Sequence, residues 1–194
     1  MTLLVIGEPR SGKTGWCRDY VDRRRKCGSS VGGILSPAVE KQGQRVGSGA
    51  IDLLTGQQVP FARLSRCRPL KKGEVAGDYT ISRDGISFAC GAIKQAIESR
   101  CDPVVIDEVG PPELRGRGLM AAAELALASA VNVRVVVRSS LKEALQRRFA
   151  GYEFTVIADL TESPSDVSEL PDCESHEPAA HESPTERRQA QKEK

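Results

Sequence analysis

The sequence predicts an α/β fold built on a mainly parallel β-sheet. Short apolar runs alternate along the chain with segments of helical periodicity, which is the order of β-α-β units. Most of these runs are unbroken, as in Leu3–Ile6 and Pro103–Ile106. Unbroken apolar runs are typical of strands that helices cover on both faces, whereas half-exposed strands alternate apolar with polar residues. The two observations together favour a layered fold with helices on both sides of the sheet.

The N-terminal elements follow a strand-helix-strand order. Leu3–Ile6 is the first predicted strand, Lys13–Lys26 has the periodicity of a helix, and Val31–Leu35 is the second strand. Residues 36–81 differ, because they are rich in glycine and turn residues and contain short alternating stretches such as Val46–Leu54. This pattern predicts β-hairpins inserted into the α/β fold.

The rest of the folded chain returns to strands and helices in turn. We expect a helix at 85–100, a strand at 103–106, a helix at 119–130, a strand at 131–137, a helix at 141–149 and a strand at 154–157. In a parallel sheet, the carboxyl ends of such strands share one edge, where ligands bind.

The charge distribution divides the 194 residues in two. Residues 161–194 are rich in Glu, Ser and Pro and carry 9 acidic and 4 basic residues, a net charge of −5. Residues 1–160 carry the other 24 basic and 17 acidic residues, so the total of +2 combines a +7 body with the acidic end. Such a polar segment cannot bury enough apolar surface to offset its ordering entropy. We therefore predict a folded domain over 1–160 and an acidic, disordered tail over 161–194.

The composition excludes several classes of protein. The two histidines, His176 and His181, both lie in the predicted tail, which argues against histidine-based triads and histidine-ligated metals. Aromatic residues make up 4% of the chain, too few for base-stacking surfaces, so nucleic acid is not an expected partner. No apolar run approaches the roughly 18 residues that a membrane helix needs, and we expect a cytoplasmic protein.

A phosphate-binding motif follows the first predicted strand. It fits the P-loop pattern G-x-x-x-x-G-K-[ST] and opens the first predicted helix. In such a loop, backbone N–H groups and the helix N-terminus face the phosphates, the lysine reaches the β- and γ-phosphates, and the hydroxyl ligates Mg²⁺. We therefore expect Lys13 to act in catalysis, Thr14 to bind Mg²⁺, and the whole loop to bind nucleotide: Gly7, Glu8, Pro9, Arg10, Ser11, Gly12, Lys13 and Thr14.

Two acidic residues follow the apolar run Pro103–Ile106. Asp107 is the expected Mg²⁺ partner, because the end of this strand would lie beside the phosphate-binding loop. Glu108 is the candidate catalytic carboxylate, since a second carboxylate beside the metal can orient and deprotonate a water. Two further residues leave alternatives open. Glu113 fits either an acid of the site or a surface residue, and Arg138 fits either a charge stabiliser or, preferably, a solvated strand end.

These segments together resemble the THEP-type nucleoside triphosphatases. GEPRSGKT resembles the first motif of that family, and VVIDEVGPPEL resembles the second, commonly IDEIG-x-MEL. VGGILSPAVEKQGQRVGSGAIDLLTG and VAGDYTI also fit, so the resemblance spans roughly residues 1–157. It implies a P-loop NTPase three-layer sandwich with inserted hairpins and Mg²⁺-dependent hydrolysis of ATP, GTP and other nucleoside triphosphates to the diphosphate and phosphate. On matching positions, Gly7–Thr14 would bind phosphates, and Asp107 and Glu108 would serve the metal and the water.

Two other functions remain open on the same residues. A small-molecule or nucleotide kinase would need an acceptor pocket and an arginine-rich lid, and no lid is obvious in the sequence. A non-catalytic nucleotide switch would bind tightly with negligible turnover. A GTPase is disfavoured, because the chain has no N-K-x-D guanine motif. The oligomeric state is not determined by the sequence.

Overall fold

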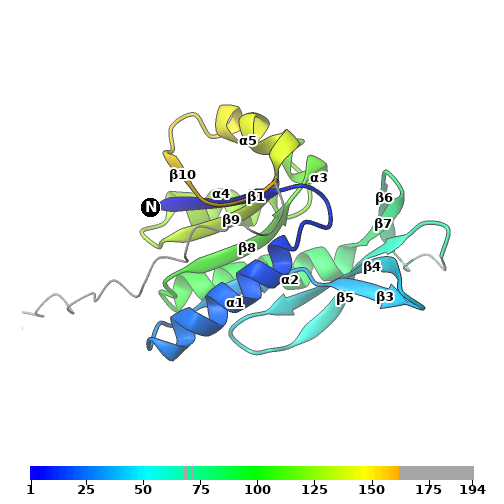
Figure 1. The fold of residues 1–194 in the computed structure, drawn as a ribbon, viewed down its shortest axis with the longest axis horizontal. Coiled ribbons are helices and arrows are strands. Elements are labelled where there is room, and N and C mark those ends of the chain that lie inside the picture. Colours follow the sequence, from blue (N-terminus) through cyan, green and yellow to red (C-terminus); the bar gives the residue numbers. More distant parts are fainter. Residues whose placement is uncertain (68–69, 71, 162–194) are drawn as a thin grey trace, which may run out of the picture.

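A ten-stranded β-sheet runs through the structure, a computed structural model that describes residues 1–67, 70 and 72–161 (Figure 1). The strand order is β10-β1-β9-β8-β2-β4-β5-β7-β6, and β3 pairs with β4. The strands are β1 (Thr2–Gly7), β2 (Gly32–Leu35), β3 (Ala38–Lys41), β4 (Gln44–Asp52), β5 (Gln58–Leu64), β6 (Gly73–Ala76), β7 (Tyr79–Ser82), β8 (Val104–Val109), β9 (Val133–Arg138) and β10 (Phe154–Leu160). The helices are α1 (Lys13–Lys26), α2 (Arg83–Glu98), α3 (Pro111–Leu114), α4 (Met120–Ala128), α5 (Lys142–Arg148) and the 3₁₀ turn η1 (Ser139–Leu141).

The sheet has a parallel half and an antiparallel half. β10, β1, β9, β8 and β2 pair in parallel, which confirms the predicted α/β architecture. The segment predicted to form hairpins supplies β3 to β7, which continue the same sheet in antiparallel pairing from the β2 edge. The inserted hairpins are therefore an extension of the sheet and not a separate layer.

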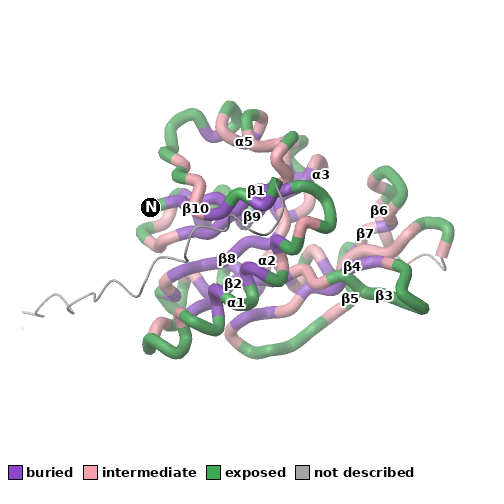
Figure 2. Tube along the Cα trace, in the orientation of Figure 1, coloured by how far each residue is buried: buried purple, intermediate pink, exposed green. Residues whose placement is uncertain are grey.

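Helices cover both faces of the parallel half and make three layers. On one face, α1 buries Trp16, Tyr20 and Val21 with alternate strand residues that include Val5 and Val105. On the other face, α2, α4 and α5 bury the intervening strand residues. In β1 and β8 these are the residues immediately before and after Val5 and Val105. Figure 2 shows that burial follows the parallel strands, while the hairpins are partly exposed. Burial of both sides of each strand explains why the runs are unbroken in sequence.

Several observed elements differ from the predicted ones, and α2, β8 and α3 are three of them. Helix α2 begins before residue 85 because the hydroxyl of Ser82 accepts a hydrogen bond from the Gly85 amide at 3.0 Å and caps it. Strand β8 continues to Val109, so Asp107 and Glu108 lie within it. After β8, Pro111 and Pro112 begin the short helix α3, because proline is tolerated in the first turn of a helix.

Two further expectations concern membrane-spanning helices and the C-terminal limit of the folded region. None of the helices in the described residues is long and apolar enough to cross a membrane. The predicted tail over 161–194 lies outside the described residues, apart from Thr161. The strand β10 ends at Leu160, at the predicted limit of the folded domain.

Candidate nucleotide-binding site

The loop between β1 and α1 has the backbone of an anion-binding turn. Gly12 begins the helix with φ 91°, and Arg10 also has a positive φ of 69°. Within the described residues, α1 has no side-chain N-cap and no acidic residue in its first turn. The amides of that turn therefore remain available to an anion, and the helix dipole adds a partial positive charge. The sequence-predicted loop thus has the geometry that phosphate binding requires.

Gly7 is required where β1 enters this loop. A Cβ atom at Gly7 would lie 2.5 Å from the Ser11 hydroxyl oxygen and 2.9 Å from the Leu160 Cβ. Neither distance is compatible with a side chain, so the close approach of β1, the loop and β10 depends on glycine. The Ser11 amide also donates to the Glu8 carbonyl at 3.1 Å, which closes the turn.

Lys13 lies buried at the base of the loop. Its ammonium group donates to the carbonyl of Gly7 at 2.9 Å and to the carbonyl of Glu8 at 2.7 Å. Burial lowers the pKa of Lys13 from its ordinary value, and the charges of Glu108 and Asp107 oppose that shift. The lysine is therefore held in the cleft that the loop lines, where it can contact a phosphate.

Thr14 and Asp107 lie side by side, as the sequence predicts for a metal pair. The Thr14 hydroxyl hydrogen-bonds the Asp107 carboxylate, which also accepts from the Ser36 amide at 3.0 Å. Burial raises the pKa of Asp107 to about 6, and both hydrogen bonds act to lower it. A hydroxyl and a carboxylate are oxygen donors of the kind Mg²⁺ prefers.

The donor set fits a nucleotide-bound Mg²⁺ better than an all-protein metal site. Across the described residues, no three His, Cys, Asp or Glu side chains gather into a metal-binding group. Magnesium in phosphate-transfer sites is commonly held by one or two protein oxygens together with phosphate oxygens and water. The pair of Thr14 and Asp107 matches that arrangement.

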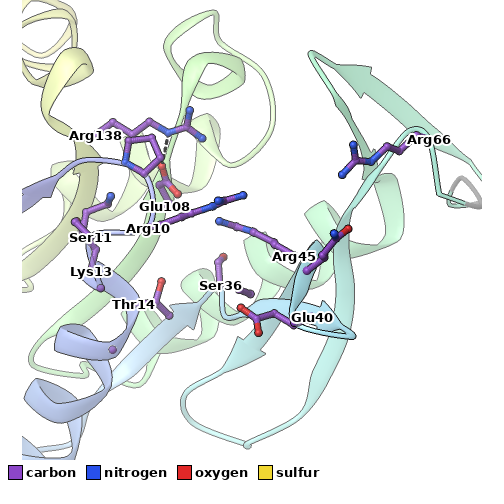
Figure 3. A pocket seen from close by; sticks show the side chains of 16 residues that line it. Arg10, Ser11, Lys13, Thr14, Ser36, Glu40, Arg45, Arg66, Glu108 and Arg138 are labelled. Atoms are coloured by element: carbon purple, nitrogen blue, oxygen red, sulfur yellow. Dashed lines mark hydrogen bonds and ion pairs between the residues drawn. The ribbon is translucent and has the colours of Figure 1, made fainter.

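Glu108 enters the same cleft from β8, next to the neighbouring strand β9. Its carboxylate accepts from Nε of Arg138 at 2.8 Å (Figure 3). The pairing register of β8 and β9 shifts between Ile106 and Val109, and such irregularities re-aim side chains near functional sites. Arg138 is therefore an ion-pair partner of Glu108 at the cleft, while its side chain remains 41% exposed at the end of β9.

A cleft of about 670 Å³ joins these residues to the hairpin extension. One wall is the phosphate-binding loop with Glu108 and Arg138, and the other comes from β3, β4 and the turn after β5 (Figure 3). Sequence reasoning missed the second wall, which includes Glu40, Arg45 and Arg66. These residues belong to no motif, and the only signal for them was the excess of basic residues in the folded part of the chain.

Glu113 is buried and connects two helices, so its interpretation as a surface residue is wrong. The side chain is 4% exposed and does not line the cleft. Its carboxylate accepts from the Gly110 amide at 2.9 Å and from the Leu119 amide at 3.2 Å, which ties α3 to the start of α4. Burial raises the pKa of Glu113, and those two hydrogen bonds oppose the rise.

Replacement of Glu113 by alanine is expected to destabilise the fold. Glu113→Ala leaves two buried amides without their acceptor, so the free energy of unfolding should fall by about 2–4 kcal/mol. Urea denaturation measures this change. As a control, Glu143 is an exposed acid on α5, and Glu143→Ala should change stability by less than about 0.5 kcal/mol. Equal stability of the two variants would contradict the structural role of Glu113.

The fold and the loop define the class of this protein. A parallel sheet whose first strand leads through Gly7–Thr14 into a helix, with an acidic strand end beside the loop, is the architecture of a P-loop nucleotide-binding protein. The chain belongs to the NTPase family, whose model, described as NTPase, matches residues 2–169. This confirms the family that the sequence motifs resemble.

Individual relatives agree with this assignment, and two solved structures share the fold. The nucleoside-triphosphatase THEP1 of Korarchaeum cryptofilum is 30% identical over 174 residues, covering 81% of this chain and 87% of the relative. THEP1 of Methanosarcina acetivorans is 30% identical over 160 residues, with 81% and 87% covered. The fold matches the crystal structure of THEP1 from Aquifex aeolicus with a TM-score of 0.63 at 22% identity, over 86% of this chain and 94% of that one. A human cancer-related nucleoside triphosphatase, solved in solution, matches with a TM-score of 0.61 at 20% identity, over 81% and 87%.

Proposed function

We propose that the protein hydrolyses nucleoside triphosphates to the diphosphate and phosphate with Mg²⁺ as cofactor. Nucleoside-triphosphatase activity is the activity of the family to which the chain belongs. The observation that carries the finer proposal is the convergence of Lys13, Thr14 and Glu108 on one cleft, with Asp107 hydrogen-bonded to Thr14. These are the groups that phosphoryl transfer to water needs.

Each residue has a separate task in this mechanism. The amides of Gly7–Thr14 and the ammonium of Lys13 hold the β- and γ-phosphates, and Thr14 and Asp107 hold Mg²⁺. When bound, Mg²⁺ neutralises charge on the phosphate oxygens. Glu108 orients a water and takes its proton as the water oxygen bonds to the γ-phosphorus and the bond to the β–γ bridging oxygen breaks. Arg138 holds the Glu108 carboxylate at the cleft.

The lining of the cleft favours a broad choice of base. None of the described residues that line it is aromatic, and most are glycine, serine or charged residues. Such a lining binds phosphate groups and does not select one base by its shape. We therefore include ATP, GTP and other nucleoside triphosphates among the substrates. The assignment of residues 1–160 as the catalytic domain and the cytoplasmic location stay predictions.

Removal of Mg²⁺ is expected to stop hydrolysis. Phosphate release should fall to background in EDTA and return when Mg²⁺ is added in excess, because the phosphate charge is then neutralised again. Asp107→Asn should raise the Mg²⁺ concentration at half-maximal rate by about 10- to 100-fold, as is usual for a carboxylate that holds a metal through water. Asp84 lies exposed on α2 away from the cleft, so Asp84→Asn should leave that concentration unchanged. Full activity in EDTA would contradict the cofactor assignment.

A further inference from the structure

The hairpin of β3 and β4 presents an arginine to the phosphate-binding loop from across the cleft. Arg45 is the second residue of β4, is half-buried, and lines the cleft. Figure 3 shows its guanidinium extending from the hairpin toward Arg10 of the loop. The conserved pattern of a phosphate-binding loop does not include this residue, and the mechanism above does not use it.

The hairpin holds Arg45 in a defined place relative to the metal pair. The connection from β2 to β3 passes through Ser36, whose amide donates to Asp107 at 3.0 Å. The hairpin then turns through Gln42 and Gly43, both with positive φ, which is the geometry of a tight two-residue β-turn. The hairpin that carries Arg45 thus follows directly in the chain from the segment that contacts Asp107.

The guanidinium of Arg45 is not neutralised by an acid. Its Nε donates to the Gly47 carbonyl at 3.3 Å, and none of the ion pairs found among the described residues includes it. Glu40 is its register partner across the hairpin, yet the two form no ion pair within the described residues. Arg138, by contrast, is paired with Glu108. The terminal nitrogens of Arg45 thus remain available for a ligand.

The excess of positive charge around the cleft favours the binding of an anion between its walls. The described residues that line it include five cationic side chains and two acidic ones. The acids are Glu40 and Glu108, and the cations are Arg10, Lys13, Arg45, Arg66 and Arg138. Like charges that converge in a partly buried cleft repel one another, and a polyanion placed between them removes that repulsion. Phosphate groups held by the loop would lie between Lys13 and Arg45.

We propose that Arg45 contacts the γ-phosphate in the transition state and stabilises the charge that develops there. This inference rests on the proposed hydrolysis. As the bond from the water oxygen to phosphorus forms and the bond to the bridging oxygen breaks, negative charge shifts onto the γ-phosphate and bridging oxygens, and the water proton goes to Glu108. Arg45 donates hydrogen bonds to those oxygens and keeps its own protons. The hairpin extension thereby supplies, within one chain, the arginine that some P-loop enzymes obtain from a partner protein.

Single-turnover kinetics separate this role from simple binding. With saturating ATP and Mg²⁺, Arg45→Ala should hydrolyse about 10³-fold more slowly than wild type. Its Kd for ATP should change by less than about tenfold, because the contact strengthens only in the transition state. Arg45→Lys keeps a charge but not the planar fork, and should remain at least about tenfold slower. A loss that appears only in Kd would overturn the proposal.

A transition-state mimic and a chemical rescue provide readouts that a structural defect would not produce. Wild type should bind ADP with aluminium fluoride more tightly than ADP alone, and Arg45→Ala should lose most of that gain. Added guanidinium ion, below denaturing concentrations, should restore part of the Arg45→Ala rate. If Arg45→Ala does not fold, as judged by circular dichroism, the rate of Arg45→Lys decides the matter, and a wild-type rate would overturn the proposal.

The control comes from the same hairpin. Lys41 is exposed on β3 and does not line the cleft, so Lys41→Ala should hydrolyse at the wild-type rate. If wild type itself releases no phosphate, the proposed hydrolysis fails. If wild type releases phosphate and Arg45→Ala does so at a rate within about threefold, well short of the loss expected for this contact, only the role of Arg45 fails.

Discussion

Lys13→Ala is expected to suppress hydrolysis by weakening nucleotide binding. The ammonium group is buried at the base of the loop and is held by two backbone carbonyls, so it is already placed where the β- and γ-phosphates would lie. Charge-assisted hydrogen bonds of this kind are worth about 2–3 kcal/mol, which corresponds to an increase in Kd of about 100-fold. Titration with a fluorescent nucleoside triphosphate analogue in the presence of Mg²⁺ measures the change.

A lysine outside the loop provides the control for this prediction. Lys26 is the last residue of α1 and is exposed, so Lys26→Ala removes the same charge from the same helix without touching the cleft. Its Kd should equal that of wild type. Wild-type affinity in Lys13→Ala would mean that the loop is not the phosphate site.

Glu108→Gln is expected to bind nucleoside triphosphate normally and to hydrolyse it at least ~100-fold more slowly, which is the usual contribution of a positioned general base. The amide oxygen of glutamine can still accept the hydrogen bond that Arg138 donates at 2.8 Å. The substitution therefore preserves the shape of the side chain and its hydrogen bond with Arg138, now without the negative charge. It removes the carboxylate that takes the proton. Burst and steady-state measurements of phosphate release, together with Kd, separate the two effects.

A distant glutamate tests whether this loss is specific. Glu98 is the last residue of α2 and is exposed, and Glu98→Gln should retain the wild-type rate. If Glu108→Gln turns over as fast as wild type, another group must deprotonate the water. A loss of affinity without a loss of rate would instead make Glu108 a binding residue.

The loop and the layer order could be predicted because both depend on local sequence. Gly7–Thr14 is a continuous motif, and its position between an apolar run and a helical pattern already defines its backbone. The predicted bounds of α1, Lys13–Lys26, agree with the structure. Asp107 and Glu108 could be placed as well, because any acid at the end of a parallel strand lies at the edge where the loop is.

The second wall of the cleft could not be predicted, because it depends on how distant strands pair. Arg45 lies across the cleft from the loop only because β4 joins the sheet beside β2 and β3 folds back on β4. The pairing of Arg138 with Glu108 likewise requires that β8 and β9 be neighbours. No motif encodes either contact. The role of Glu113 could not be predicted for a similar reason. Its burial depends on α3, a short helix whose Gly-Pro-Pro start is more typical of a turn.

One measurement tests the central claim that this cleft transfers the γ-phosphate to water. Purified wild-type protein is mixed with γ-labelled ATP and Mg²⁺ without any acceptor, and both inorganic phosphate and nucleotide are quantified. The account predicts that phosphate and diphosphate appear in equal amounts, over many turnovers, and that Glu108→Gln suppresses both. Tightly bound ATP that stays intact, or label that leaves ATP only when an organic acceptor is added, would contradict it.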